Sequence, residues 1–421
     1  MENNLIIGIN EKPKSITKWI VLSLQHVFAM FGATILVPIV TGLDHGVALV
    51  ASGIGTLIYI LCTKGKVPVY LGSSFAYMTA ISLAGAATGY DSAYVGLMLV
   101  GIVYVVVAFI IRFFGSEWIK KLLPPIVIGP MIIIIGLYLS PIAIGYSGLD
   151  GSKDILSVLV AIITFITIVI ISVFGKGFFK IIPFIIAILI GYIASIIFGI
   201  VDVKEVFKDI NFFQVPDFVF LGTYKLDFSA ALLFLPIAFV TIAEHIGDHV
   251  VLGEITQKDF LEDPGLKNTL VGDGIATFVS AALGGPANTT YGENTGVVAM
   301  TRVGSVYVVA LAAIIAISLG FLGYIQAFVG SIPEVVLGGM TIVLYGLIAS
   351  NGIKVLIKAK TNMANIRNII IVSTMLVIGL GGAAIPINEA SSLTGMSLAA
   401  MVGIILNLAL PENLKSKKDN Q

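Results

Sequence analysis

The sequence predicts an all-α polytopic membrane protein with fourteen transmembrane segments in two inverted repeats of seven, interrupted by short extended strands in segments 3 and 10. Three observations support this prediction. The chain is too apolar for a water-soluble globule, its basic residues gather on one side of the expected segments, and its two halves share short motifs at matching places.

The composition alone places most of the chain in a lipid environment. Of the 421 residues, 57% are hydrophobic and 11% are charged, whereas a typical soluble domain carries about 25% charged residues. Each span of a bilayer core needs roughly 20 mainly apolar residues. Apolar runs fill most of the sequence from Trp19 to Leu410, which leaves room for about a dozen or more spans.

Breaks at Gly, Pro and charged residues divide the apolar runs into two groups of seven segments. The first group is expected to start near Trp19, Gly46, Val67, Ala93, Pro124, Ile155 and Ile181, and the second near Ala230, Thr269, Asn288, Gly304, Pro333, Ile369 and Leu393. The stretch 201–227 is the longest polar connection, so it is the natural midpoint of the chain.

The distribution of basic residues supports this count and gives an orientation. Lys and Arg accumulate in loops that stay in the cytoplasm. When the chain starts inside and changes side at every segment, only Lys153, Lys204, Lys208 and Lys225, of 24 Lys and Arg in all, fall outside. We therefore expect a multi-pass protein of the cell membrane with both termini in the cytoplasm.

Similar motifs stand at matching places in the two groups. Gln25-His26 corresponds to Glu244-His245, the run 73–76 to the run 289–292, and the run 124–131 of segment 5 to the run 333–340 of segment 12, which share Pro, Gly and Met at the same spacing. Because seven is odd, the two halves would insert with opposite orientation, which is a common plan of secondary transporters with substrate bound where the halves meet.

The N-terminal residues and the single cysteine argue against a secretory signal, a disulfide and a thiolate metal site. Residues 1–18 are polar, contain Pro13 and lack the features of a secretory signal, so we expect a short soluble tail there. Cys62 is the only cysteine and cannot form an intramolecular disulfide. Redox chemistry and thiolate metal sites therefore have little support, and we expect neither a metal nor a cofactor.

The densest polar cluster lies in segment 8, in the run 243–249. Ionisable groups in a bilayer are costly and are usually functional. Glu244 and Asp248 are four residues apart and share one helix face, so both cannot ionise cheaply and one could exchange protons. We expect proton coupling to involve Glu244, Asp248 and His245. Alternatively, Asp248 lies on the wet cytoplasmic side and merely pairs with Lys.

A second cluster spans 288–302 and follows the helix-breaking Gly284-Gly285-Pro286. Its polar and β-branched residues are typical of a short extended segment before a half-helix, which survives at membrane depth only where it lines a cavity. A half-helix starting near Glu293 would point free N–H groups into that cavity. Its partner, the run 72–77, has the same broken character and could supply Phe75 as an aromatic wall. Alternatively, Glu293 only caps a buried helix terminus.

These groups describe a pocket with two carboxylate acceptors, backbone donors and an aromatic surface. A flat, neutral heterocycle with adjacent N–H and C=O groups fits such a pocket, whereas carboxylates would repel an inorganic anion. The sequence offers no nucleophile and base set and no phosphate-binding loop, so we expect no enzyme.

The run Glu293-Asn294-Thr295-Gly296 with Thr301-Arg302 resembles the [QE]-N-x-G-x4-T-R motif of the nucleobase-ascorbate transporter family, also called nucleobase:cation symporter-2. The context 288–294 together with 243–245 is similar to the uracil permease branch, and the similarity covers essentially the whole chain. Xanthine and purine relatives usually carry Gln where Glu293 stands.

The resemblance implies a core domain from segments 1–4 and 8–11 and a gate domain from the rest. The expected boundaries are 1–18 (N-terminal tail), 19–115 (core), 116–228 (gate), 229–325 (core), 326–411 (gate) and 412–421 (C-terminal tail). It also implies that Glu244 and Glu293 hydrogen-bond a uracil ring, that the backbone at Phe75 and Gly292 meets its carbonyls, and that Tyr291, Tyr345 and Ala33 line the site.

The resemblance implies import of uracil by proton symport. Relatives form homodimers through gate-domain faces, and whether this chain does so is an open question. We expect no nucleic-acid partner. Some relatives carry His at the position of Asp248, so the route of the proton is a separate question from substrate binding. The alternatives are a xanthine or purine permease of the same family, or a channel or membrane enzyme.

Overall fold

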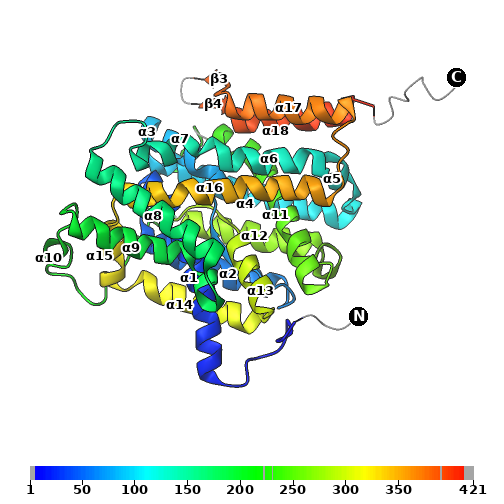
Figure 1. Cartoon of the computed structure of the whole chain (residues 1–421). Helices are drawn as coiled ribbons and strands as arrows, with labels where there is room; N and C mark the ends of the chain where they lie inside the picture. The colour runs from blue at the N-terminus through cyan, green and yellow to red at the C-terminus, as the bar shows by residue number, and fades with distance from the viewer. Residues whose placement is uncertain (1–4, 221–222, 230, 389–390, 412–421) are drawn as a thin grey trace.

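The computed structural model describes residues 5–220, 223–229, 231–388 and 391–411. Within these ranges the chain is mainly helical (Figure 1). The C-terminal tail expected at 412–421 lies outside the described residues.

In the first half of the chain the elements are α1 (Ile16–Thr41), α2 (His45–Cys62), β1 (Leu71–Ser73), η1 (Phe75–Tyr77), α3 (Met78–Ala87), α4 (Tyr90–Phe114), α5 (Glu117–Leu122), α6 (Pro125–Tyr138), α7 (Ser140–Ser147), α8 (Ile155–Phe174), η2 (Gly177–Ile181), α9 (Pro183–Ile197) and α10 (Val203–Val206).

In the second half they are α11 (Ala231–Thr256), η3 (Leu261–Gly265), α12 (Leu266–Ala282), β2 (Asn288–Thr290), α13 (Gly292–Thr301), α14 (Val306–Gly320), α15 (Gly323–Gly330), α16 (Glu334–Lys358), α17 (Ile366–Leu380), β3 (Ala384–Asn388), β4 (Ser391–Thr394) and α18 (Gly395–Ala409).

Seven helical stretches among the described residues are long and apolar enough to cross a membrane. They are α1, α2, α4, the consecutive pair α6 and α7, α8, α11 and α16. Shorter apolar helices, including α9, α14, α17 and α18, stand at other positions expected from the sequence. The exposed side chains of α8 include Ile155, Ile166, Ile170 and Phe174, an apolar surface typical of contact with lipid tails.

The helices form two packed groups. In one, α16 packs on α6, α7 and α8, and α17 lies beside α18 against α6. In the other, α12 packs against α4 and α2, and α14 packs against α2 and α1. Helix α6 packs against both α16 and α11, and α11 packs against α4; α17 and α18 form an outer layer at the top of Figure 1. The two groups meet where α11 contacts α6 and α18.

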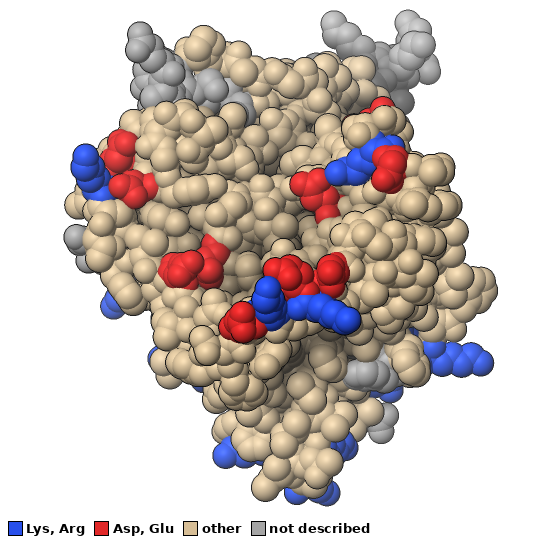
Figure 2. Space-filling view, turned by 90° about the vertical axis from the view of Figure 1, so that its left-hand side faces the viewer, with Lys and Arg blue, Asp and Glu red and all other residues tan. Residues whose placement is uncertain are grey.

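The two ends of the molecule differ in charge. The end that carries α10 and the connection between α7 and α8 shows many acidic and few basic side chains (Figure 2). The polar connections there hold Lys153, Lys204 and Lys208, which are three of the four basic residues expected outside. The described chain begins and ends at the opposite side of the molecule (Figure 1).

Candidate functional site

Two short strands, β1 and β2, lie side by side at the centre of the site, in the segments 3 and 10 where strands were expected. Strand β1 pairs antiparallel with β2, with Gly72 opposite Thr289. The pairing continues on both sides, because Ser74 N donates to Ala287 O at 2.8 Å and Tyr291 N donates to Tyr70 O at 3.1 Å. The prediction of short extended strands in these two segments is therefore confirmed, and the structure adds that the strands pair, so that their backbone groups satisfy one another.

Helix α13 starts directly after β2. Tyr291 is its extended N-cap, and Glu293 lies in the first turn. The first N–H groups of a helix have no partner within the helix, so this terminus offers donors as well as the Glu293 carboxylate. The first turn is tied to α1, because the Asn294 side-chain amide donates to His26 O at 3.0 Å.

A cavity of about 260 Å³ lies between these strands, α11 and α16. Three carboxylates line it, from Glu244 and Asp248 on α11 and Glu293 on α13. Glu244 and Glu293, the two acids expected to bind substrate, therefore line the same cavity as Asp248, an acid expected to take part in proton coupling. The remaining lining includes Phe75, Tyr291, Gly292, Gly296, Ile348, Asn351 and Lys354.

The three carboxylates are held in different ways. Asp248 Oδ2 accepts a hydrogen bond from the Thr290 hydroxyl at 2.5 Å. Among the described residues, no hydrogen bond to another side chain holds Glu244 or Glu293, so both carboxylates keep acceptor capacity for a ligand in the cavity.

The aromatic residues divide into lining and supporting groups. Phe75 and Tyr291 line the cavity, but the Tyr291 hydroxyl is already used, because it donates to Ser73 O at 3.0 Å. Tyr345 and Ala33 are buried and do not line the cavity. The Tyr345 ring meets the Phe75 ring edge-on, with centroids 6.2 Å apart, so Tyr345 supports the wall that Phe75 forms.

His245 points away from the cavity into the packed helices. Its Nδ1 lies 2.9 Å from Asp273 Oδ2, and both side chains are fully buried. The neighbouring His249 contacts the Tyr59 hydroxyl through Nε2 at 2.5 Å. Sequence reasoning missed Asp273, although an acid alone in the mainly apolar run of α12 is a signal of function or of a buried partner.

Sequence reasoning also missed the contribution of α16. Asn351, Lys354 and Lys358 line the cavity from this helix, and Lys354 Nζ donates to Asn351 Oδ1 at 3.2 Å. Their spacing of three and then four residues places them on one helix face, which was the available signal. Lys358 also forms an ion pair with Glu254 at the end of α11.

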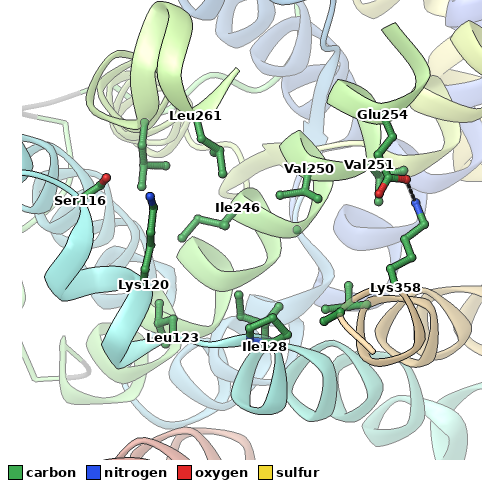
Figure 3. A pocket seen from close by; sticks show the side chains of 15 residues that line it. Ser116, Lys120, Leu123, Ile128, Ile246, Val250, Val251, Glu254, Leu261 and Lys358 are labelled. Atoms are coloured by element: carbon green, nitrogen blue, oxygen red, sulfur yellow. Dashed lines mark hydrogen bonds and ion pairs between the residues drawn. The ribbon is translucent and has the colours of Figure 1, made fainter. Parts of the chain in front are cut away.

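A second cavity of about 390 Å³ adjoins the first and shares Gly247, Val251, Val355 and Lys358 with its lining. Figure 3 shows Ile246, Val250 and Val251 of α11 facing Ile128 of α6, with the Glu254–Lys358 pair on one side. Both cavities lie between the two groups of helices, with lining residues from α11 on one side and α16 on the other. The described residues contain no group of three or more side chains suited to hold a metal ion.

The sequence was then compared with known protein families. The model of a family described as "Permease family", named for xanthine and uracil permeases, matches residues 17–388. The chain belongs to this family. It is therefore a multi-pass membrane transporter rather than an enzyme.

Curated relatives match along nearly the whole chain. The permease is 47% identical to a uracil permease of Bacillus caldolyticus over 97% of this chain and 95% of that protein. It is 42% identical to a uracil permease of Escherichia coli K12 over 96% and 93%. A putative pyrimidine permease, RutG, of the same organism is 34% identical over 94% of this chain and 90% of that protein.

Solved structures share the fold of the permease at low identity. The transmembrane domain of the cyanobacterial bicarbonate transporter BicA superposes with a TM-score of 0.64 at 16% identity, covering 95% of this chain and 99% of that one. The murine anion transporter Slc26a9 in its inward-facing state gives 0.68 at 12% identity, covering 94% and 68%.

Proposed function

We propose that this permease imports uracil by proton symport. The observation that carries the proposal is the cavity in which Glu244 and Glu293 meet beside the free N–H groups of α13. The names of relatives at 42–47% identity over nearly the full chain support uracil as the substrate. At about 260 Å³, the cavity lies below the roughly 300–1,000 Å³ of pockets for larger ligands, as suits a single small ring.

Each polar edge of the ring has a matching partner in this proposal. Glu244 and Glu293 accept hydrogen bonds from the ring N–H groups, and the backbone at Gly292 and Phe75 donates to the ring carbonyls. Phe75 forms the apolar wall. Tyr291, Tyr345 and Ala33 hold the surrounding strands and helices in place rather than carry the polar recognition.

Proton coupling is assigned to the carboxylates of α11. Asp248 and Glu244 share the cavity with Glu293, and a proton on any of the three lowers the repulsion among them. His245 would act behind the cavity through its contact with Asp273. Inward movement of one charge gains about 2.3 kcal/mol for every 100 mV of membrane potential, which is enough to concentrate a neutral substrate.

Alternating access would move two domains of a fourteen-segment inverted repeat against each other. The cavity lies between α11 and α13, which belong to the expected core, and α16, which belongs to the expected gate. Lys120 and Lys358 line the adjoining cavity, and by the positive-inside rule these basic residues support a cytoplasmic opening. The conformation described here is then inward-facing, in a cell membrane with both termini inside.

Uptake of labelled uracil into proteoliposomes with an inward proton gradient tests the proposal. We expect gradient-driven uptake by the wild type and its loss in Glu244→Gln and in Glu293→Gln. Glu205→Gln is the matched control, because Glu205 is exposed on α10, pairs with Lys208 and lines neither cavity.

Absence of uracil uptake by a folded wild-type protein would refute the substrate assignment, and labelled xanthine would be tested next. Uptake that is saturable but indifferent to the proton gradient would retain uracil and refute the symport.

A further inference from the structure

The segment before the first helix is docked on the transporter rather than extended away from it. Residues 5–11 run along the link 302–306, which joins α13 to α14. Ile6 N donates to Arg302 O at 2.7 Å, Gly304 N to Ile7 O at 3.0 Å, and Val306 N to Ile9 O at 2.9 Å. This pattern is that of a strand added in parallel, with Ile7 opposite Val303. We call residues 5–11 the N-terminal strap.

Side chains secure the same contact. Ile7 is 7% exposed and forms a small apolar cluster with Val303 and Val308, against which Trp19 packs. The Ser305 hydroxyl donates to Glu11 O at 2.5 Å. A Cβ atom at Gly304 would lie 2.9 Å from a side-chain carbon of Leu5, so the strap and the link approach closely because this residue is glycine.

The strap meets the chain where α13 ends. The helix stops at Thr301, and Arg302 adopts the left-handed conformation with φ of 55°. The other end of α13 is fixed by β2 and by Asn294 on α1. Near its C-terminus the helix is more open, because Met300 is 46% exposed. The strap is therefore the main backbone anchor at that end among the described residues.

We infer that the N-terminal strap is a positioning element of the transport site. It holds the C-terminal end of α13 and so keeps Glu293, in the first turn of the same helix, in its place in the cavity. An isolated helix of ten residues is marginal without tertiary contacts, so the direction of α13 depends on anchors at both ends. The strap touches no ligand and acts only through α13.

This inference rests on the proposed function for its effect on uracil, but its structural part can be measured without any ligand. The first experiment compares amide hydrogen exchange in the wild type and in a variant lacking residues 2–11. We expect faster exchange in α13, with α17 in the other group of helices unchanged. Unchanged exchange in α13 would overturn the inference, and so would an equal increase in α13 and α17, because that result means general destabilisation.

A matched pair of substitutions separates the backbone contact from the side chain. Ile6→Pro removes the N–H group that donates to Arg302 O, whereas Ile6→Ala keeps that group and changes only a side chain that is 67% exposed. Since small misplacements of a binding group have large effects, we expect uracil affinity to fall about tenfold in the deletion variant and severalfold in Ile6→Pro. Ile6→Ala should match the wild type.

Affinity is measured by equilibrium binding of labelled uracil to purified protein. Equal affinity in the wild type, the deletion variant and Ile6→Pro would overturn the positioning role. If the wild type itself binds no uracil, the proposed substrate fails, while the exchange experiment still decides whether the strap positions α13.

Discussion

At the scale of single residues, the three carboxylates of the cavity differ in whether a side chain already donates a hydrogen bond to them. Asp248 is already bound by the Thr290 hydroxyl, whereas Glu244 and Glu293 have no such partner among the described residues. Among the described residues, a substrate N–H group therefore competes with no side-chain donor at Glu244 or Glu293. This difference supports the proposed role of both carboxylates in recognition.

Gly296 offers a test in which stability and binding should change in opposite directions. It lies in the interior of α13 and lines the cavity, and nothing lies within 4 Å of an added Cβ. Ala at a compatible helical position stabilises by about 0.4–1 kcal/mol, so Gly296→Ala should raise the melting temperature. The added methyl group would enter the cavity, so uracil affinity should fall. Thermal unfolding and equilibrium binding of one preparation check both, and unchanged affinity would contradict the cavity as the site.

The buried pair of His245 and Asp273 predicts a second contrast. An unsatisfied buried polar group costs about 1–3 kcal/mol, so Asp273→Leu, which leaves His245 Nδ1 without its partner, should lower the free energy of unfolding by that amount. Asp273→Asn retains a carbonyl oxygen that can accept from Nδ1–H and should cost less. Denaturation in detergent measures both variants, and equal losses would show that the carboxylate charge rather than the hydrogen bond matters.

The sequence identified Glu244, Asp248 and Glu293 because acids in apolar runs are costly enough to be noticed. Asn351 and Lys358 carry no comparable signal, because polar residues near the end of a span are common. Their place in the cavity follows only from the packing of α16 across from α11. Asp273 does carry the signal of an acid in an apolar run, but its partner His245 lies 28 residues away in the chain, so only the fold reveals the pair.

At the scale of elements, close helix packing depends on glycine. A Cβ at Gly53 of α2 would lie 2.4 Å from Ala313 O of α14. Gly53→Val must therefore push these helices apart, and overpacking of this kind costs at least about 1–3 kcal/mol. For Gly53→Val we expect little folded protein by size-exclusion chromatography. Gly346→Ala on α16 is the control and should fold normally, because nothing lies within 4 Å of a Cβ added there. Equal yields of folded protein from the two variants would refute the close contact at Gly53.

Hydropathy and loop charge predicted the long helices and the two broken segments, since burial in lipid imposes both patterns on the chain. They could not predict α5, α10 or α15, which are too short to show a span-length signal. The β3–β4 hairpin was missed because its two strands are short and lie next to each other at the start of an expected span. The docked strap was missed because its partner at Val303 lies far away in the chain, and an edge contact leaves no periodic pattern in the sequence.

At the scale of the whole molecule, the two cavities lie where the two groups of helices face each other. The groups are joined by helix contacts, such as those of α11 with α6 and α18, and by side-chain interactions beside the cavities. One is the ion pair between Glu254 of α11 and Lys358 of α16, which Figure 3 shows next to the lining residues. In the proposed alternating access, a pair that crosses the boundary between the two groups stabilises one conformation over the other.

Breaking this pair should reduce the population of the conformation described here. The side chains of Lys358 and Glu254 are 38% and 52% exposed, and such a pair contributes about 0–1 kcal/mol, so the population changes by at most about fivefold.

The measurement is the labelling rate of Ala299→Cys, which lines the cavity, by a membrane-impermeant thiol reagent in a Cys62→Ser background. Both Glu254→Gln and Lys358→Gln should slow it, whereas a direct effect of charge on the thiolate would act in opposite directions in the two variants. Glu205→Gln, which breaks an exposed pair with Lys208 away from both cavities, should leave the rate unchanged. High salt should bring the wild type closer to both variants. Opposite effects of Glu254→Gln and Lys358→Gln would show that the pair does not join the two moving parts.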